Sequence, residues 1–123
     1  MTVQNLLHTY KRYRSLQTHV ITALPVVILM PHSSCNCRCI MCDIWKGNNS
    51  VQQLKEEDVA AMLHTLKKMG TQQVLMSGGE ALLHQNFFRL CALLKSAGIK
   101  ISLHTTGKQL KKYSDEIIKW VDD

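Results

Sequence analysis

Three closely spaced cysteines are the residues of this sequence best suited to chemistry. Cys35, Cys39 and Cys42 follow the pattern Cys-x3-Cys-x2-Cys, directly after the apolar run 26–30. Three thiolates on one short loop can bind three irons of a cubane iron–sulfur cluster, because cysteine thiolate is the usual protein ligand of such iron. The fourth iron would then lack a protein ligand, and a metal with an open position is usually a reactive one. The spacing therefore predicts chemistry at a metal cluster.

Zinc binding is the main competing interpretation of these cysteines. Cys37 lies inside the motif and would be the fourth ligand of a zinc site. All four thiols would then crowd one short stretch, without the second Cys-x2-Cys-like pair that zinc sites usually have. We therefore favour Cys37 as a bystander. The fifth cysteine, Cys91, falls on the apolar side of a predicted helix and is expected to be a buried small hydrophobe.

Apolar periodicity divides the chain into a leading helix and three strand–helix units. Residues 3–21 space their apolar side chains as an amphipathic helix does, and Pro25 ends any continuation. The β-branched run 26–30 predicts a strand that is buried on both faces. The remaining elements are expected over the following ranges: strands at 74–76 and 99–103, helices at 56–69, 87–97 and 109–121.

This order predicts an α/β fold with parallel strands and crossover helices. Three units amount to somewhat under half of a (β/α)8 barrel of about 250 residues. We expect a partial TIM-like barrel made of the first three βα units, preceded by a helix. The expected division is an N-terminal amphipathic helix at 1–23 and a core domain at 24–123.

Two further loops follow the second and third predicted strands. One reads Ser77-Gly78-Gly79-Glu80 and the other Thr105-Thr106-Gly107. Because the carboxyl ends of parallel strands open on one face, all three loops should converge with the cysteines there. Gly78 and Gly79 would let a ligand approach the backbone, and Glu80 offers a carboxylate to a cation such as an ammonium group. Taken alone, the Gly-Gly-Glu loop is more simply a tight turn, and a plain strand-to-helix turn explains Thr105-Thr106-Gly107 equally well.

Charge and composition make several partners less probable. The formal net charge is +6, but the basic residues are scattered, so nucleic-acid binding is unlikely on this pattern. No run approaches the ~18 apolar residues that span a membrane, and the polar N-terminus resembles no secretory signal. Clustered cysteines favour metal or redox chemistry over a disulfide framework. We expect a cytoplasmic protein without a membrane partner.

With both motifs in this order, the sequence resembles the radical S-adenosylmethionine (radical SAM) enzymes over roughly residues 24–123. The resemblance implies that Cys35, Cys39 and Cys42 bind a [4Fe-4S] cluster whose fourth iron is chelated by SAM. It also implies that the Gly-Gly-Glu loop binds the ammonium group of the SAM methionine and that the backbone near Met41 contacts the SAM adenine. The implied cofactor-binding residues are Met41, Gly78, Gly79, Glu80 and Thr106.

The implied reaction is reductive cleavage of SAM to a 5'-deoxyadenosyl radical, which takes hydrogen from a substrate. The stretch Met41–Lys46 resembles members that modify peptides or build cofactors, so a peptide or small molecule is the expected substrate. A reductant such as flavodoxin or ferredoxin is also implied. The motifs identify no residue that contacts the substrate.

The sequence departs from the family at three points. Met41 stands where an aromatic residue is common, and Thr105-Thr106-Gly107 stands where relatives often carry Asn before Gly. The later barrel strands are missing, so the remaining half could come from another chain. The chain could equally be a truncated fragment without turnover of its own.

Overall fold

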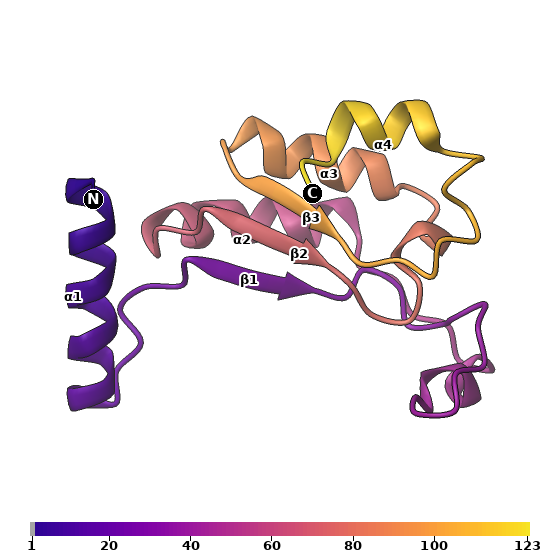
Figure 1. Ribbon diagram of the computed structural model, residues 1–123, viewed down its shortest axis with the longest axis horizontal. Helices are drawn as coiled ribbons and strands as arrows, with labels where there is room; N and C mark the ends of the chain where they lie inside the picture. The colour runs from indigo at the N-terminus through magenta and orange to yellow at the C-terminus, as the bar shows by residue number, and fades with distance from the viewer. Residues whose placement is uncertain (1) are drawn as a thin grey trace.

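A three-stranded parallel sheet forms the centre of the molecule. The computed structural model describes residues 2–123 (Figure 1). The strands β1 (Val26–Leu29), β2 (Gln73–Met76) and β3 (Lys100–Leu103) pair in the order β1-β2-β3, every neighbour parallel. Each strand is followed by helical structure, so the predicted α/β arrangement of three strand–helix units is confirmed.

One face of the sheet is covered by helices. These are α2 (Glu56–Lys68), α3 (Phe87–Ser96) and α4 (Ser114–Trp120), which succeed one another along the sheet (Figure 1). The side chains between helices and strands are buried and almost entirely apolar, and burying such surface is the main driving force of folding. The fully buried members include Val59, Val74, Met76, Leu90, Leu94 and Ile101.

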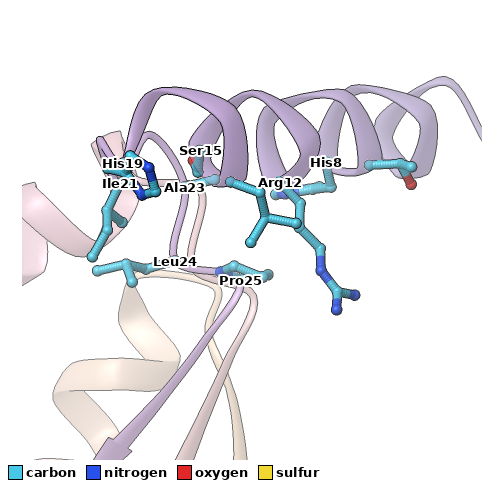
Figure 2. A pocket seen from close by; sticks show the side chains of 10 residues that line it. His8, Arg12, Ser15, His19, Ile21, Ala23, Leu24 and Pro25 are labelled. Atoms are coloured by element: carbon cyan, nitrogen blue, oxygen red, sulfur yellow. The ribbon is translucent and has the colours of Figure 1, made fainter.

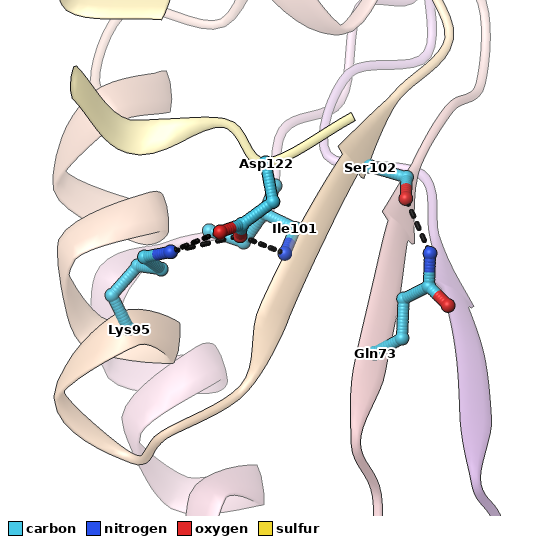
Figure 3. A network of polar contacts seen from close by, with 5 residues as sticks. All are labelled: Gln73, Lys95, Ile101, Ser102 and Asp122. Carbon is cyan, nitrogen blue, oxygen red and sulfur yellow. Dashed lines mark hydrogen bonds and ion pairs between the residues drawn. The ribbon is translucent and has the colours of Figure 1, made fainter. Parts of the chain in front are cut away.

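The other face of the sheet is open along β1. Ile28 is 58% exposed and Met30 is 64% exposed, whereas Leu29 between them is buried. The prediction that this strand is buried on both faces is therefore wrong, since no described element packs against its second face. Farther along the same face, Gln73 donates a hydrogen bond to Ser102 on the neighbouring strand (Figure 3).

The observed helix ends differ from the predictions by a few residues. The leading helix, α1 (Val3–Thr18), stops before the predicted residue 21, because His19 takes a left-handed conformation with φ of 56°. The helix predicted from 109 starts only at Ser114, and the residues before it form turns. Two short 3-10 helices were not predicted: η1 (Ile44–Gly47) and η2 (Ala81–Leu83).

The apolar side of α1 points to solvent. Leu6, Tyr10 and Tyr13 are each more than half exposed, and the helix contains no buried residue. One polar contact joins it to the domain, a hydrogen bond between His8 and Gln72. The predicted amphipathic helix exists, and its apolar side is not covered by any other part of residues 2–123.

A cavity of about 690 Å³ separates α1 from the segment that leads to β1. Figure 2 shows His8, Arg12 and Ser15 of the helix facing Leu24 and Pro25 across it. The cavity lies at the amino ends of the strands, far along the sheet from the cysteine loop (Figure 1). No helix within residues 2–123 is both long enough and apolar enough to cross a membrane.

The C-terminal residues run beside β3. The Asp122 carboxylate accepts hydrogen bonds from Lys95 Nζ at 2.6 Å and from the backbone N–H of Ile101 at 2.8 Å (Figure 3). These two donors hold the pKa of Asp122 below its usual value. Leu103 donates to the carbonyl of Asp123 at 2.8 Å, so the segment satisfies part of the outer edge of β3.

Core packing, and not α1, should determine the stability of this fold. Leu90→Ala should lower the free energy of unfolding by about 2–5 kcal/mol, because it opens a cavity in a fully buried site. Leu6→Ala should change the same quantity by about 0.5 kcal/mol or less. Urea denaturation followed by circular dichroism compares the two variants. An equal loss in both would mean that the apolar side of α1 is packed.

Candidate functional site

Three loops meet at the carboxyl ends of the strands. The backbone N–H of Ser77 donates to Leu29 at 2.9 Å, and that of Glu80 donates to Ser34 at 2.9 Å. These bonds join the loop after β2 to the cysteine loop after β1. The loop after β3 is joined to both by side-chain hydrogen bonds, so the convergence predicted from the parallel order is found.

Gly79 lies directly against the backbone of the cysteine loop. A Cβ at this position would stand 2.1 Å from the carbonyl oxygen of Ser34, a distance at which no side chain fits. Gly78 has φ of +111°, which only glycine adopts without strain. The two glycines thus allow the loop after β2 to pack against the cysteine loop. The sequence alone did not identify the cysteine loop as their neighbour.

The buried Glu80 carboxylate connects two of the three loops. Only 1% of this residue is exposed, and its oxygens accept from Leu82 N at 3.0 Å, from Thr105 Oγ1 at 2.9 Å and from Thr106 N at 2.6 Å. Burial alone would raise the pKa of this carboxyl. The hydrogen bonds, chiefly those of Thr106, outweigh burial and set the pKa of Glu80 below its usual value. The ionised carboxylate therefore holds the second and third loops together.

Asn48 braces the first cysteine. Its side-chain amide accepts from Cys35 N at 3.1 Å and donates to Cys35 O at 2.9 Å. Another amide, that of Asn36, accepts a hydrogen bond from Thr106 Oγ1, which links the first and third loops. Neither asparagine was a candidate from sequence. No local signal could have identified Asn48, because its bonds to Cys35 join residues that lie thirteen positions apart in the sequence.

The three cysteines of the predicted motif have free thiols. Cys35 and Cys42 are partly buried and Cys39 is exposed, and none of them forms a disulfide. Among residues 2–123, no three His, Cys, Asp or Glu side chains are gathered closely enough to hold a metal ion. The donor chemistry nevertheless fits an iron–sulfur cluster, because the accessible groups are soft thiols on one loop. Loading would have to draw the three sulfurs together.

The other two cysteines differ sharply in their surroundings. Cys91 is fully buried in the core, as expected, and burial raises the pKa of its thiol to about 12. Such a thiol is inert as a metal ligand. Cys37 is partly buried in the loop, and its backbone N–H donates to the sulfur of Cys35 at 3.4 Å.

The predicted cofactor residues lie around this junction with different accessibility. Met41 has a side chain that is 96% exposed beside Cys42. Thr106 is exposed, although its backbone N–H is bonded to Glu80. Gly78 lines a cavity of about 350 Å³ next to the cysteine loop. Hydrogen bonds thus bring Gly79, Glu80 and Thr106 together with residues 32–36 at the start of the cysteine loop.

A family model for the radical SAM superfamily matches residues 29–122. This match includes the cysteine motif, the Gly-Gly-Glu loop and nearly all of the three strand–helix units. The chain belongs to the radical SAM superfamily. The family resemblance of the two sequence motifs is therefore confirmed.

Two curated relatives are enzymes with different names. The chain is 32% identical over 79 residues to a 7-carboxy-7-deazaguanine synthase of Rhodopirellula baltica, covering 61% of this chain and 29% of the relative. It is 26% identical over 98 residues to a probable GTP 3',8-cyclase of Archaeoglobus fulgidus, covering 80% and 32%. The chain thus spans about three tenths of the length of these relatives.

A solved structure shares the fold. SuiB of Streptococcus suis, bound to S-adenosylmethionine, superposes with a TM-score of 0.70 at 19% identity, over 93% of this chain and 27% of SuiB. A second SuiB structure, bound to the precursor peptide SuiA, gives a TM-score of 0.69. This likeness confirms the partial parallel barrel.

Acid should weaken the junction at Glu80. The pKa of Glu80 is lower in the folded protein than in the unfolded chain. The ionised carboxylate therefore stabilises the fold fully when the pH is above the unfolded-state pKa, and this stabilisation is lost as the pH falls through the folded-state pKa. Glu80→Gln should lower the free energy of unfolding at pH 7 by about 1–3 kcal/mol. Denaturant titrations of both proteins should converge as the pH is lowered toward 3. A gap that stays constant with pH would contradict the role of the charge.

Proposed function

We propose that this chain binds a [4Fe-4S] cluster through Cys35, Cys39 and Cys42 and S-adenosylmethionine at the remaining iron. The observation that carries the proposal is the set of free thiols at the carboxyl end of β1, packed against the Gly-Gly-Glu loop in a radical SAM chain. When bound, such a cluster supplies the electron that cleaves SAM to methionine and a 5'-deoxyadenosyl radical.

The residues of the chain would act by position. Asn48 fixes the backbone of Cys35 on both sides, which orients the first thiol without contacting it. Backbone groups near Gly78, Met41 and Thr106 are the proposed contacts of SAM, with Gly79 holding the two loops together. We assign Glu80 chiefly to holding these loops, because its oxygens already accept hydrogen bonds within the chain. A direct contact with the SAM ammonium would require those bonds to be exchanged.

The substrate is proposed only as a class. The named relatives are a 7-carboxy-7-deazaguanine synthase and a GTP 3',8-cyclase, and the structural neighbour SuiB is bound to a precursor peptide. A small molecule or a peptide, in cofactor biosynthesis or peptide modification, is therefore the proposed range. An external reductant such as flavodoxin or ferredoxin would supply the electron. Since the chain spans about three tenths of its relatives, turnover would require groups that complete the SAM and substrate pockets.

Reconstitution tests the cluster directly. The chain is incubated anaerobically with iron and sulfide, reduced, and examined by EPR before and after addition of SAM. We expect a [4Fe-4S] signal that changes when SAM binds. Replacing Cys35, Cys39 or Cys42 singly by alanine should abolish the signal and the bound sulfide, because each thiolate holds one iron.

Two matched cysteines serve as controls. Cys37→Ala and Cys91→Ala should retain iron and sulfide, since one thiol is a proposed bystander and the other lies in the core. Stoichiometric zinc without labile sulfide, lost on replacing Cys37, would instead establish a structural zinc site. A cluster signal that does not change when SAM is added would refute the proposal that SAM binds the iron without a cysteine ligand.

A further inference from the structure

Trp45 carries a buried donor without a partner. Among the buried side-chain nitrogens and oxygens of residues 2–123, two form no hydrogen bond: Nε1 of Trp45 and Nδ1 of His8. His8 Nε2 accepts a hydrogen bond from the side-chain N–H of Gln72 at 3.0 Å, so a neutral His8 carries its proton on Nδ1, which is a second unpaired donor. That nitrogen belongs to α1, at the opposite end of the sheet from the cysteine loop. An indole N–H is always a donor. Leaving it unpaired costs about 1–3 kcal/mol, so the unsatisfied Trp45 requires an explanation.

Trp45 lies beside the cysteine loop, at a cavity whose lining contains no carboxylate. Trp45 belongs to η1, which begins two residues after Cys42. It lines a cavity of about 450 Å³ together with Cys35, and no carboxylate lines that cavity. The other lining residues are amides and cations: Asn36, Arg38, Lys46, Asn48 and Asn49. The two cations and the N–H groups of the amides in this lining can bind an anionic acceptor such as a sulfur beside Cys35.

Arg38 strengthens this donor. Its guanidinium carbon lies 5.5 Å from the centroid of the Trp45 ring, and Arg38 forms no ion pair among residues 2–123. A cation over the ring withdraws electron density from the indole and makes its N–H a better donor. Lys46 also lies near the ring, at 5.7 Å, but its charge is offset by Asp43 at 2.7 Å.

We propose that the Trp45 N–H donates a hydrogen bond to a sulfur of the loaded cysteine loop, the thiolate of Cys35 or a bound sulfide, and that Arg38 supports it. This inference rests on the proposed function. Reduction adds one electron and therefore negative charge to the cluster, so a donor to sulfur stabilises the reduced form more than the oxidised form. Trp45 would thus contact the cluster directly and raise its reduction potential without contacting substrate.

An isosteric replacement isolates the N–H. The chain has two tryptophans, so Trp120→Phe leaves Trp45 as the only one. In that background, 3-benzothienylalanine at position 45 keeps the bicyclic shape and removes the donor. The midpoint potential is measured by EPR-monitored redox titration after anaerobic reconstitution. We expect the reduction equilibrium to become about tenfold less favourable, which corresponds to a fall of about 59 mV for one electron.

Matched controls separate this effect from general damage. Trp120→Phe alone should keep the wild-type potential, and iron and sulfide per chain should be the same in all variants. Arg38→Gln should lower the midpoint potential. Lys119→Gln is the matched control, because Lys119 lies 4.8 Å from the Trp120 ring as Arg38 lies 5.5 Å from the Trp45 ring, and it should leave the potential unchanged.

Two failures are distinguishable. A wild-type chain that takes up no iron and sulfide would overturn the proposed function together with this inference. Loaded wild-type protein and loaded benzothienyl protein with equal midpoint potentials would overturn the role of Trp45 alone. Trp45→Phe provides a second comparison, because it removes the N–H with a natural residue, and it should lower the potential in the same direction.

Discussion

The close approach of Gly79 to the Ser34 carbonyl is the contact on which the site depends. It brings the loop after β2 against the cysteine loop, and the neighbouring backbone bond from Glu80 to Ser34 fixes their register. From that fixed position, the buried carboxylate of Glu80 reaches Thr105 and Thr106 on the third loop. A side chain at position 79 would therefore disturb all three strand ends together.

The order of the elements and the cysteine motif could be predicted from sequence because both are local signals. Alternating apolar runs identified the three strands within one residue at each end, and the predicted convergence of their loops follows from parallel pairing alone. The partners of those loops could not be predicted. Which carbonyl stands opposite Gly79, or which amide braces Cys35, depends on contacts between distant segments that leave no periodic pattern.

The expectation that β1 is buried on both faces was wrong for a physical reason. Apolar runs and apolar spacing show that β1 and α1 carry apolar side chains, but they do not show what covers those side chains. In the structure, Leu6 and Tyr10 face solvent, as Ile28 does on the open face of the sheet. The polar contacts of His8 and Ser15 determine how α1 is held, and such contacts between segments are invisible to a hydrophobic pattern.

The unequal bracing of the cysteines has a consequence for cluster assembly. Asn48 clamps both backbone groups of Cys35, whereas Cys39 and Cys42 share a single backbone bond of 3.3 Å. Immobilising a flexible segment costs conformational entropy, so in the proposed cluster more of that cost would fall on Cys39 and Cys42 than on Cys35. The thiol of Cys35 would then bind iron first, and the other two would close around the bound metal.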